Sequence, residues 1–182
     1  WDVKAVVAGY NYTFGSRGLG TPETLERIGK ERGFRVLVVP PVLYEGEPVS
    51  STRVREAVER GDVALAGALL GRMYSLSGRI IRNKRIGRRI GFPTANIEPE
   101  ERRVLPPDGV YATIAYVRGA AYRAVTNIGT NPTIEDGKLG IETHLLDFDA
   151  DIYGEVLTVV FHSFLRGEIK FKSVEELKEQ IK

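Results

Sequence analysis

The chain contains no cysteine, which excludes disulfide bridges, thiolate metal sites and cysteine nucleophiles together. It has only two histidines, and its 26 Lys and Arg side chains nearly balance 24 Asp and Glu, leaving a formal charge of +2. A charge so close to zero gives no global field for attracting nucleic acid. No apolar run approaches the roughly 18 residues of a membrane span, so we expect a soluble chain without a membrane partner. The absence of cysteine fits a reducing compartment, and we expect the cytoplasm.

The hydrophobic pattern begins with an α/β unit. Residues 3–8 and 34–39 are nearly continuous apolar runs rich in β-branched residues, typical of parallel strands that are covered on both faces. Between them, Thr21 and Pro22 start a predicted helix that ends at Gly33. Strand, loop, helix and strand in this order predict half of a doubly wound, Rossmann-like α/β domain.

The pattern changes in the second part of the chain. Two short helices, 52–60 and 62–70, complete the first part, so we expect residues 1–72 to form one domain and residues 73–182 the other. The second part shows short β-rich runs separated by turn residues, at 75–82, 109–117, 121–128, 141–148 and 156–164. Such runs predict a small antiparallel barrel or sandwich. A capping-box pattern that begins at Ser173 predicts a closing C-terminal helix.

A basic, glycine-containing segment of the second part has the composition of a phosphate site. Its six basic residues are Arg79, Arg82, Lys84, Arg85, Arg88 and Arg89. Gly87 and Gly91 allow backbone amides to approach phosphate oxygens closely. Pro93 fixes the chain direction, so that Thr94 and Asn96, two apart on an extended segment, point the same way. A Thr hydroxyl can ligate Mg²⁺, and an Asn amide can bridge metal and phosphate. A solvated basic hairpin is the alternative.

Glu142 stands in a strand-like run that is otherwise mostly apolar. Because side chains alternate along a strand, Glu142 and His144 share a face, and we expect the Glu142 carboxylate to face the barrel interior. A carboxylate buried there costs several kcal/mol of stability unless it is paired with a cation or takes part in catalysis. It is either a base or orienting acceptor for a substrate hydroxyl, or the partner of an arginine in a structural ion pair. His144 and His162 have no second ligand at metal-binding spacing, so we interpret both as packing residues.

Two segments of the first part stand where α/β folds bind ligands. The loop 9–20 follows the first strand and precedes the capped helix, but it does not spell Gly-x-Gly-x-x-Gly, and a mobile surface loop is the alternative. Residues 49–55 place hydroxyls and arginines at a helix N-terminus, which suits an anion. Simple N-capping, which one Ser or Thr satisfies, is the alternative there.

Several ordered motifs in the second part resemble one family closely. They are 78–81, 87–97, 108–111, 126–133, 142–148, 151–154 and 164–166. From about Tyr74 to its end, the chain resembles the riboflavin kinase module of bacterial bifunctional FAD synthetases. The resemblance implies a six-stranded antiparallel Greek-key barrel that transfers the γ-phosphoryl group of ATP to the ribityl 5′-hydroxyl of riboflavin, giving FMN.

The resemblance also implies a nucleotide site. Its residues would be Gly87, Arg88, Gly91, Thr94 and Asn96. Thr94 and Asn96 would hold Mg²⁺ and the phosphates of ATP, while the segment 87–91 would cover them.

The same resemblance implies the catalytic and flavin-binding residues. Glu142 would take the hydroxyl proton, and Arg166 would lie near the flavin. Residues 127–139 would form a flap that orders when substrates bind. For 131–139 an ordinary hairpin connection is the alternative, because Asn-Pro and Asp-Gly are turn pairs anywhere.

The first part resembles the second half of the FMN adenylyltransferase module of the same enzymes. The corresponding residues are Asn11, Phe14, Ser50, Ser51, Thr52 and Arg55. The family often has Asp where Asn11 stands, and its early His-x-Gly-His element has no counterpart, because the only histidines are His144 and His162. We therefore expect an incomplete nucleotidyltransferase half, and no FAD formation by the 182-residue chain unaided.

Two other functions compete with the kinase. A nucleic-acid-binding barrel would use the basic run 79–89, but that run has no interleaved aromatic residues to stack bases, and Glu142 would repel phosphates. A flavin-sensing barrel without turnover is the other alternative. The combination of Thr94, Asn96 and Glu142 argues against it.

Overall fold

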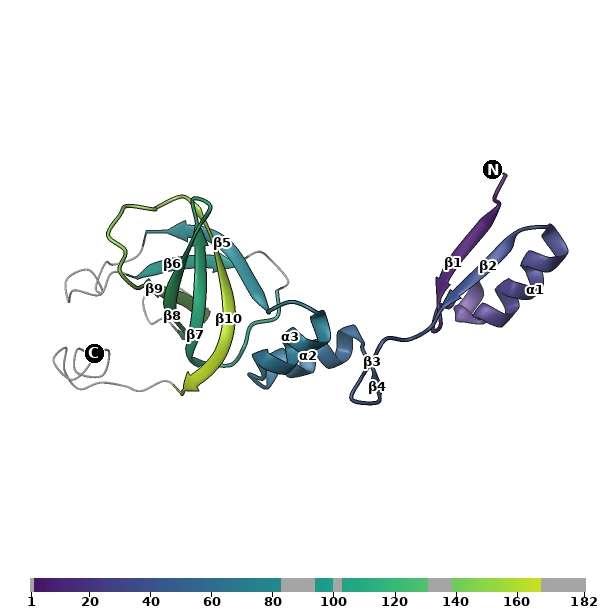
Figure 1. The fold of residues 1–182 in the computed structure, drawn as a ribbon, viewed down its shortest axis with the longest axis horizontal. Coiled ribbons are helices and arrows are strands. Elements are labelled where there is room, and N and C mark those ends of the chain that lie inside the picture. The colour runs from purple at the N-terminus through teal and green to yellow at the C-terminus, as the bar shows by residue number, and fades with distance from the viewer. Residues whose placement is uncertain (1, 83–93, 100–102, 131–138, 168–182) are drawn as a thin grey trace. The chain divides into compact units, whose positions relative to one another are not determined.

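The computed structural model describes residues 2–82, 94–99, 103–130 and 139–167 (Figure 1). Contacts divide the chain into two compact units, Trp1–Val49 and Ser50–Lys182. Among the described residues, no helix combines the length and the apolar character that crossing a membrane requires. The helix predicted from Ser173 lies outside the described residues.

The first unit contains a two-stranded parallel sheet and one α-helix. β1 (Ala5–Gly9) pairs with β2 (Arg35–Val39), and α1 (Pro22–Arg32) connects the two strands. The Thr21 hydroxyl accepts a hydrogen bond of 3.4 Å from the backbone N–H of the third helical residue. Gly33 ends the helix in a left-handed conformation, with φ 78°. These are the start and stop signals that the sequence shows, and the strand–helix–strand order is as predicted.

Two short elements of this unit were not predicted. A 3₁₀ turn covers Ser16–Gly18, and β3 (Leu43–Tyr44) forms a hairpin with β4 (Glu47–Pro48). The two hairpin-turn residues have φ values of 54° and 80°, as a type I′ turn requires. Strands of two residues are too short to show an alternating pattern in the sequence.

The second unit begins with a helical hairpin. α2 (Ser51–Glu59) packs against α3 (Val63–Leu70), and α3 packs against a barrel strand. Val63 belongs to the same cluster of buried residues as the barrel core. The contacts therefore join both helices to the barrel, whereas the sequence pattern groups them with the α/β part.

Six antiparallel strands close into a barrel, with the order β10-β5-β6-β9-β8-β7 (Figure 1). Their bounds are β5 Ser75–Ile81, β6 Ala95–Pro99, β7 Gly109–Val117, β8 Ala120–Thr130, β9 Leu139–Leu145 and β10 Val156–Arg166. β7, β8 and β9 form a meander, β9 lies beside β6, and β10 closes the ring between β7 and β5. This is the predicted six-stranded Greek-key barrel.

Aromatic residues fill one part of the barrel interior. The ring of Tyr111 meets Phe161 edge-on, with centroids 5.4 Å apart, and both residues are at most 1% exposed. The Tyr111 hydroxyl donates a hydrogen bond of 2.8 Å to the carbonyl of Pro107. Burial raises the pKa of Tyr111, and nearby Asp108 raises it further. The phenol therefore keeps its proton and its role as donor at neutral pH.

Three buried threonines form a second interior feature, which we name the threonine ladder. Thr113, Thr126 and Thr143 are between 0% and 4% exposed. Hydrogen bonds between hydroxyls join Thr113 to Thr126 at 2.9 Å and Thr126 to Thr143 at 3.0 Å. The ladder thus satisfies three polar groups inside an apolar barrel and ties β7, β8 and β9 together.

Thr126→Val is expected to lower the free energy of unfolding by about 1–3 kcal/mol, because two buried hydroxyls lose their shared partner. Urea unfolding of both proteins measures the difference. Thr158→Val is the matched control, since Thr158 bonds Ser77 at 2.8 Å in a half-buried pair that water reaches. An equal loss in both variants would show that the ladder contributes no more than a surface hydroxyl pair.

Candidate active site

Three polar residues lie side by side on the face of the barrel sheet that is opposite to the core, and we name them the Asn–Glu–Asn row; Asn96 is 8% exposed, and Glu142 and Asn127 are half-buried. The strand registers pair Asn96 of β6 with Glu142 of β9, and Glu142 with Asn127 of β8. The residues that flank them along the strands are all buried: Ala95, Ile97, Thr126, Ile128, Ile141 and Thr143. Because side chains alternate along a strand, the row is on the opposite, outer face. Directly paired residues have Cα atoms about 4.5–5.5 Å apart, so Glu142 stands between two carboxamides.

The expectation that Glu142 faces the barrel interior is wrong. Ile141 and Thr143 are 0% exposed and belong to the interior, whereas Glu142 is half-buried on the other side of the strand. His144 shares this outer face and is also half-buried. Both faces of this run carry apolar residues, so the sequence alone does not show which face is the core.

Asn127 is a further candidate site residue, which sequence reasoning did not select. The sequence analysis includes it in the family motif 126–133 and at the start of the predicted flap, but assigns it no role. Its position beside Glu142 follows from the β8–β9 register, which pairs residues distant in sequence. Of the predicted flap 127–139, the described residues 127–130 belong to β8 and residue 139 to β9, while 131–138 lie outside the described residues.

Arg166 continues the same circumferential row. Asn127 pairs with Val110 of β7, and Val110 pairs with Arg166 of β10, after two irregularities in the β10 register. Arg166 is half-buried at the end of its strand. The registers thus place Arg166 two strands from Asn127 and three from Glu142.

Thr94 lies at a small pocket at one end of the barrel. The pocket has a volume of about 70 Å³ and is lined by Ile80, Thr94, Ala95, Leu145, Phe148, Asp149, Ala150, Asp151, Ile152 and Tyr153. Ligand pockets usually measure about 300–1,000 Å³, so this one holds only part of a ligand. Thr94 and Asn96 flank Ala95, which is buried, so both belong to the outer side of β6. Thr94 therefore links the pocket to the Asn–Glu–Asn row.

The donor set around Thr94 and Asn96 suits Mg²⁺. The hydroxyl, the carboxamide and the carboxylate of Glu142 all offer oxygen ligands, which this ion prefers. Within the part of the chain that the structure describes, no group of three or more His, Cys, Asp or Glu side chains forms a metal cage. Such a site fits Mg²⁺ held by one or two protein oxygens, with phosphate oxygens and waters completing the shell. The predicted nucleotide residues Gly87, Arg88 and Gly91 lie outside the described residues.

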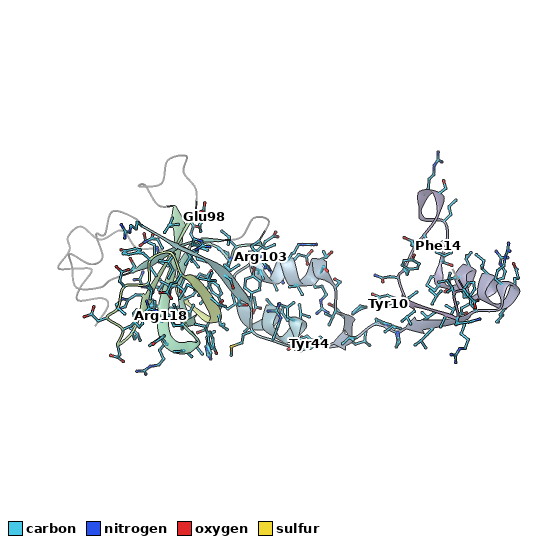
Figure 2. The ribbon with its side chains drawn as sticks, turned by 90° about the horizontal axis from the view of Figure 1, so that it is seen from above. Tyr10, Phe14, Tyr44, Glu98, Arg103 and Arg118 are labelled. Atoms are coloured by element: carbon cyan, nitrogen blue, oxygen red, sulfur yellow. The ribbon has the colours of Figure 1, made fainter. Side chains whose placement is uncertain are left out.

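The two candidate segments of the first part belong to different compact units. In the first unit, Asn11 is exposed and Phe14, which Figure 2 labels, is half-buried. The ring of Phe14 stacks on that of Tyr12, with centroids 5.8 Å apart. A backbone bridge joins Phe14 to Gly20 and closes this loop.

In the second unit, Ser50 caps α2 by accepting a hydrogen bond of 3.2 Å from the backbone of Arg53. This is the capping role foreseen as the alternative for the segment. The other three residues, Ser51, Thr52 and Arg55, lie in the first turns of the helix and are exposed. Nucleotide contact by these residues stays a prediction.

The second unit is thus a closed antiparallel barrel with Asn96, Glu142 and Asn127 paired in register across three strands, and a strand–helix–strand unit precedes it in the chain. Residues 70–182 match the model of the riboflavin kinase family, and residues 1–53 match that of FAD synthetase. The chain belongs to the riboflavin kinase family.

Curated relatives agree with this assignment. The chain is 41% identical to the bifunctional riboflavin kinase/FMN adenylyltransferase of Pseudomonas fluorescens, over 98% of this chain and 58% of that protein. It is 37% identical to the protein of the same name from Bacillus subtilis, over 99% of this chain and 58% of that protein. The chain thus spans somewhat more than half the length of the curated relatives it matches.

A solved structure shares the fold. The macrolide-efflux protein from Streptococcus pneumoniae superposes with a TM-score of 0.87 at 38% identity, over 97% of this chain and 57% of that one. The name belongs to that protein. From the structural similarity we infer only that the two chains share the same architecture.

Proposed function

We propose that this chain is a riboflavin kinase that transfers the γ-phosphoryl group of Mg·ATP to the 5′-hydroxyl of riboflavin, giving FMN and ADP. The observation that carries the proposal is the direct pairing of Asn96 with Glu142 in a barrel of this family. It brings the proposed metal ligand beside the proposed acceptor of the hydroxyl proton. In this proposal, a longer enzyme carries out the adenylylation of FMN to FAD. The formation of FMN takes place in the cytoplasm.

Positioning and charge neutralisation carry most of the catalysis in this mechanism. Phosphoryl transfer passes through a loose transition state in which the nucleophile needs alignment more than deprotonation. Glu142 accepts the hydrogen of the riboflavin hydroxyl and aims its oxygen at the γ-phosphorus. The carboxamides of Asn96 and Asn127 on either side orient the carboxylate and the bound oxygens. Bound Mg²⁺ would neutralise charge on the phosphates, held through Thr94 and Asn96.

The pocket beside Thr94 is the proposed site for the nucleotide. Its apolar walls, including Ile80, Phe148 and Tyr153, suit one flat ring system, and Thr94 at its edge leads toward the row. Arg166, on the other side of Glu142, is the proposed flavin contact. The two substrates then approach Glu142 from opposite directions along the barrel surface.

Incubation of the 182-residue chain with riboflavin and Mg·ATP, followed by separation of FMN from FAD, tests the proposal. We expect FMN and no FAD. Absence of FMN would refute the kinase. Accumulation of FAD would refute the interpretation of residues 1–72 as an incomplete nucleotidyltransferase.

Thr94→Ala is expected to raise KM for Mg·ATP about three- to tenfold and to leave KM for riboflavin nearly unchanged, because one oxygen ligand or hydrogen bond is lost on the nucleotide side. Initial rates measured with each substrate varied in turn give both constants. Thr94→Ser keeps the hydroxyl and should restore most of the affinity. An equal loss for both substrates would indicate a collapsed barrel end instead.

A further inference from the structure

The loop between β9 and β10 forms one wall of the pocket beside Thr94. We name residues 147–155 the pocket loop. Phe148, Asp149, Ala150, Asp151, Ile152 and Tyr153 of this loop all line the pocket. A contact that fixes the pocket loop therefore fixes the shape of the pocket, even when the contact lies outside it.

Arg118 makes such a contact from the hairpin between β7 and β8 (Figure 2). Its Nε donates to the two carboxylate oxygens of Glu155 at 2.9 and 3.2 Å, and its Nη2 donates to Oε1 at 2.5 Å. The same Nη2 also donates to the backbone carbonyl of Asp151 at 2.8 Å. One guanidinium thus holds two points of the pocket loop, with donors in a fixed planar fork that an ammonium lacks.

The conformation of the hairpin aims Arg118 at the loop. Arg118 and Gly119 both have positive φ, 53° and 76°, as a type I′ turn requires. A left-handed conformation is costly for arginine, whose Cβ crowds the backbone there. Glu155 raises the pKa of Arg118 through hydrogen bonding and charge, so the guanidinium stays protonated at any physiological pH.

Other contacts complete the frame of the pocket loop. Arg79 of β5 donates to the carbonyl of Gly154 at 2.6 Å, and Tyr122 of β8 meets Phe148 edge-on with centroids 4.8 Å apart. The backbone N–H of Tyr153 donates to Asp151 Oδ1 at 3.1 Å within the loop. Backbone hydrogen bonds join Gly154 and Glu155 to Ile80 of β5, and the side chains of Arg79 and Arg118 add contacts with Gly154, Asp151 and Glu155.

We propose that Arg118 is a positioning residue for nucleotide binding, which acts by holding the pocket loop in the conformation that the nucleotide meets. This inference rests on the proposed assignment of the pocket to the nucleotide. Arg118 is not among the residues that line the pocket, so it acts through Asp151 and Glu155. Without these contacts, ordering of the loop becomes a cost of nucleotide binding, whereas riboflavin on the Arg166 side bears none of it.

Arg118→Ala is expected to raise KM for Mg·ATP, and the dissociation constant of Mg·ADP in calorimetry, about three- to fivefold. KM for riboflavin and the midpoint of thermal unfolding should stay nearly unchanged. Arg118→Lys should give an intermediate shift, because it keeps the charge but loses the fork. Glu155→Gln should reproduce part of the shift, and the double variant should fall short of the product of the single effects.

Arg123→Ala is the matched control. Arg123 also pairs with the pocket loop, but its contact with Asp147 is 3.7 Å long and both side chains are more than 80% exposed. Removing this charge should leave both KM values unchanged.

The possible outcomes separate this inference from the proposed function. If the unaltered chain forms no FMN and binds no Mg·ADP, the nucleotide assignment fails, and the inference fails with it. If the unaltered chain is active but Arg118→Ala changes neither constant, or raises both KM values equally, only the inference is overturned. Should Arg118→Ala not fold, Glu155→Gln provides the same comparison.

Discussion

Glu142→Gln is expected to lower kcat for FMN formation about a hundredfold, with little change in the binding of riboflavin or Mg·ATP. Glutamine has nearly the same shape and can still lie between Asn96 and Asn127. It cannot take the proton of the 5′-hydroxyl, because an amide oxygen is a far weaker base than a carboxylate, and it offers one acceptor oxygen where glutamate offers two. The expected loss of kcat is near the lower end of general-base effects, because in a loose transition state the alignment of the nucleophile matters more than the basicity of its acceptor.

Single-turnover measurement of FMN formation, with substrate binding followed separately, tests this expectation. His144→Gln is the matched control, because His144 lies two residues further along β9 on the same outer face and is equally half-buried. It should keep most of the rate. Equal losses in the two variants would assign the effect to the surface of β9 as a whole, and unchanged turnover in Glu142→Gln would remove Glu142 from the mechanism.

Elements with a strong local pattern could be predicted from the sequence. The buried runs of β1 and β2 and the caps of α1 are each specified by neighbouring residues, and five barrel strands show as β-rich runs. The sixth, β6 (Ala95–Pro99), does not stand out as a run, because it is short and carries Asn96, Glu98 and Pro99. Its place in the barrel came only from the resemblance to the family.

The arrangement of the site depends on long-range pairing, and the sequence predicted it only in part. Thr94, Asn96 and Glu142 could be named as candidates from residue type and motif. That Asn96 and Glu142 are direct partners depends on β9 lying beside β6, which no local pattern encodes. The same pairing decided which face of β9 is outside, where the prediction for Glu142 was wrong, and it revealed Asn127.

Gly109→Ala is expected to lower the free energy of unfolding by about 3 kcal/mol. After the loss of kcat in Glu142→Gln, this is the second large effect that we expect. Gly109 begins β7 with φ 153°, a conformation that L side chains rarely adopt. A Cβ there would lie 2.6 Å from Cε2 of Phe164 and 2.8 Å from the backbone oxygen of Arg166. The ring can turn aside, but the backbone oxygen can move only with the end of β10. Urea unfolding measures the loss.

Gly119→Ala separates backbone strain from the clash. Gly119 also has positive φ, 76°, but apart from its chain neighbours no atom lies within 4 Å of the place that a Cβ would take, so alanine there should cost only about 1 kcal/mol.

Since the clash at Gly109 displaces Arg166, the proposed flavin contact, Gly109→Ala should also raise KM for riboflavin more than KM for Mg·ATP. Thr94→Ala is expected to do the opposite and raise KM for Mg·ATP more than KM for riboflavin. If both glycine variants cost the same and leave KM for riboflavin unchanged, then β10 yields freely at this point, and the position of Arg166 is not what holds the flavin.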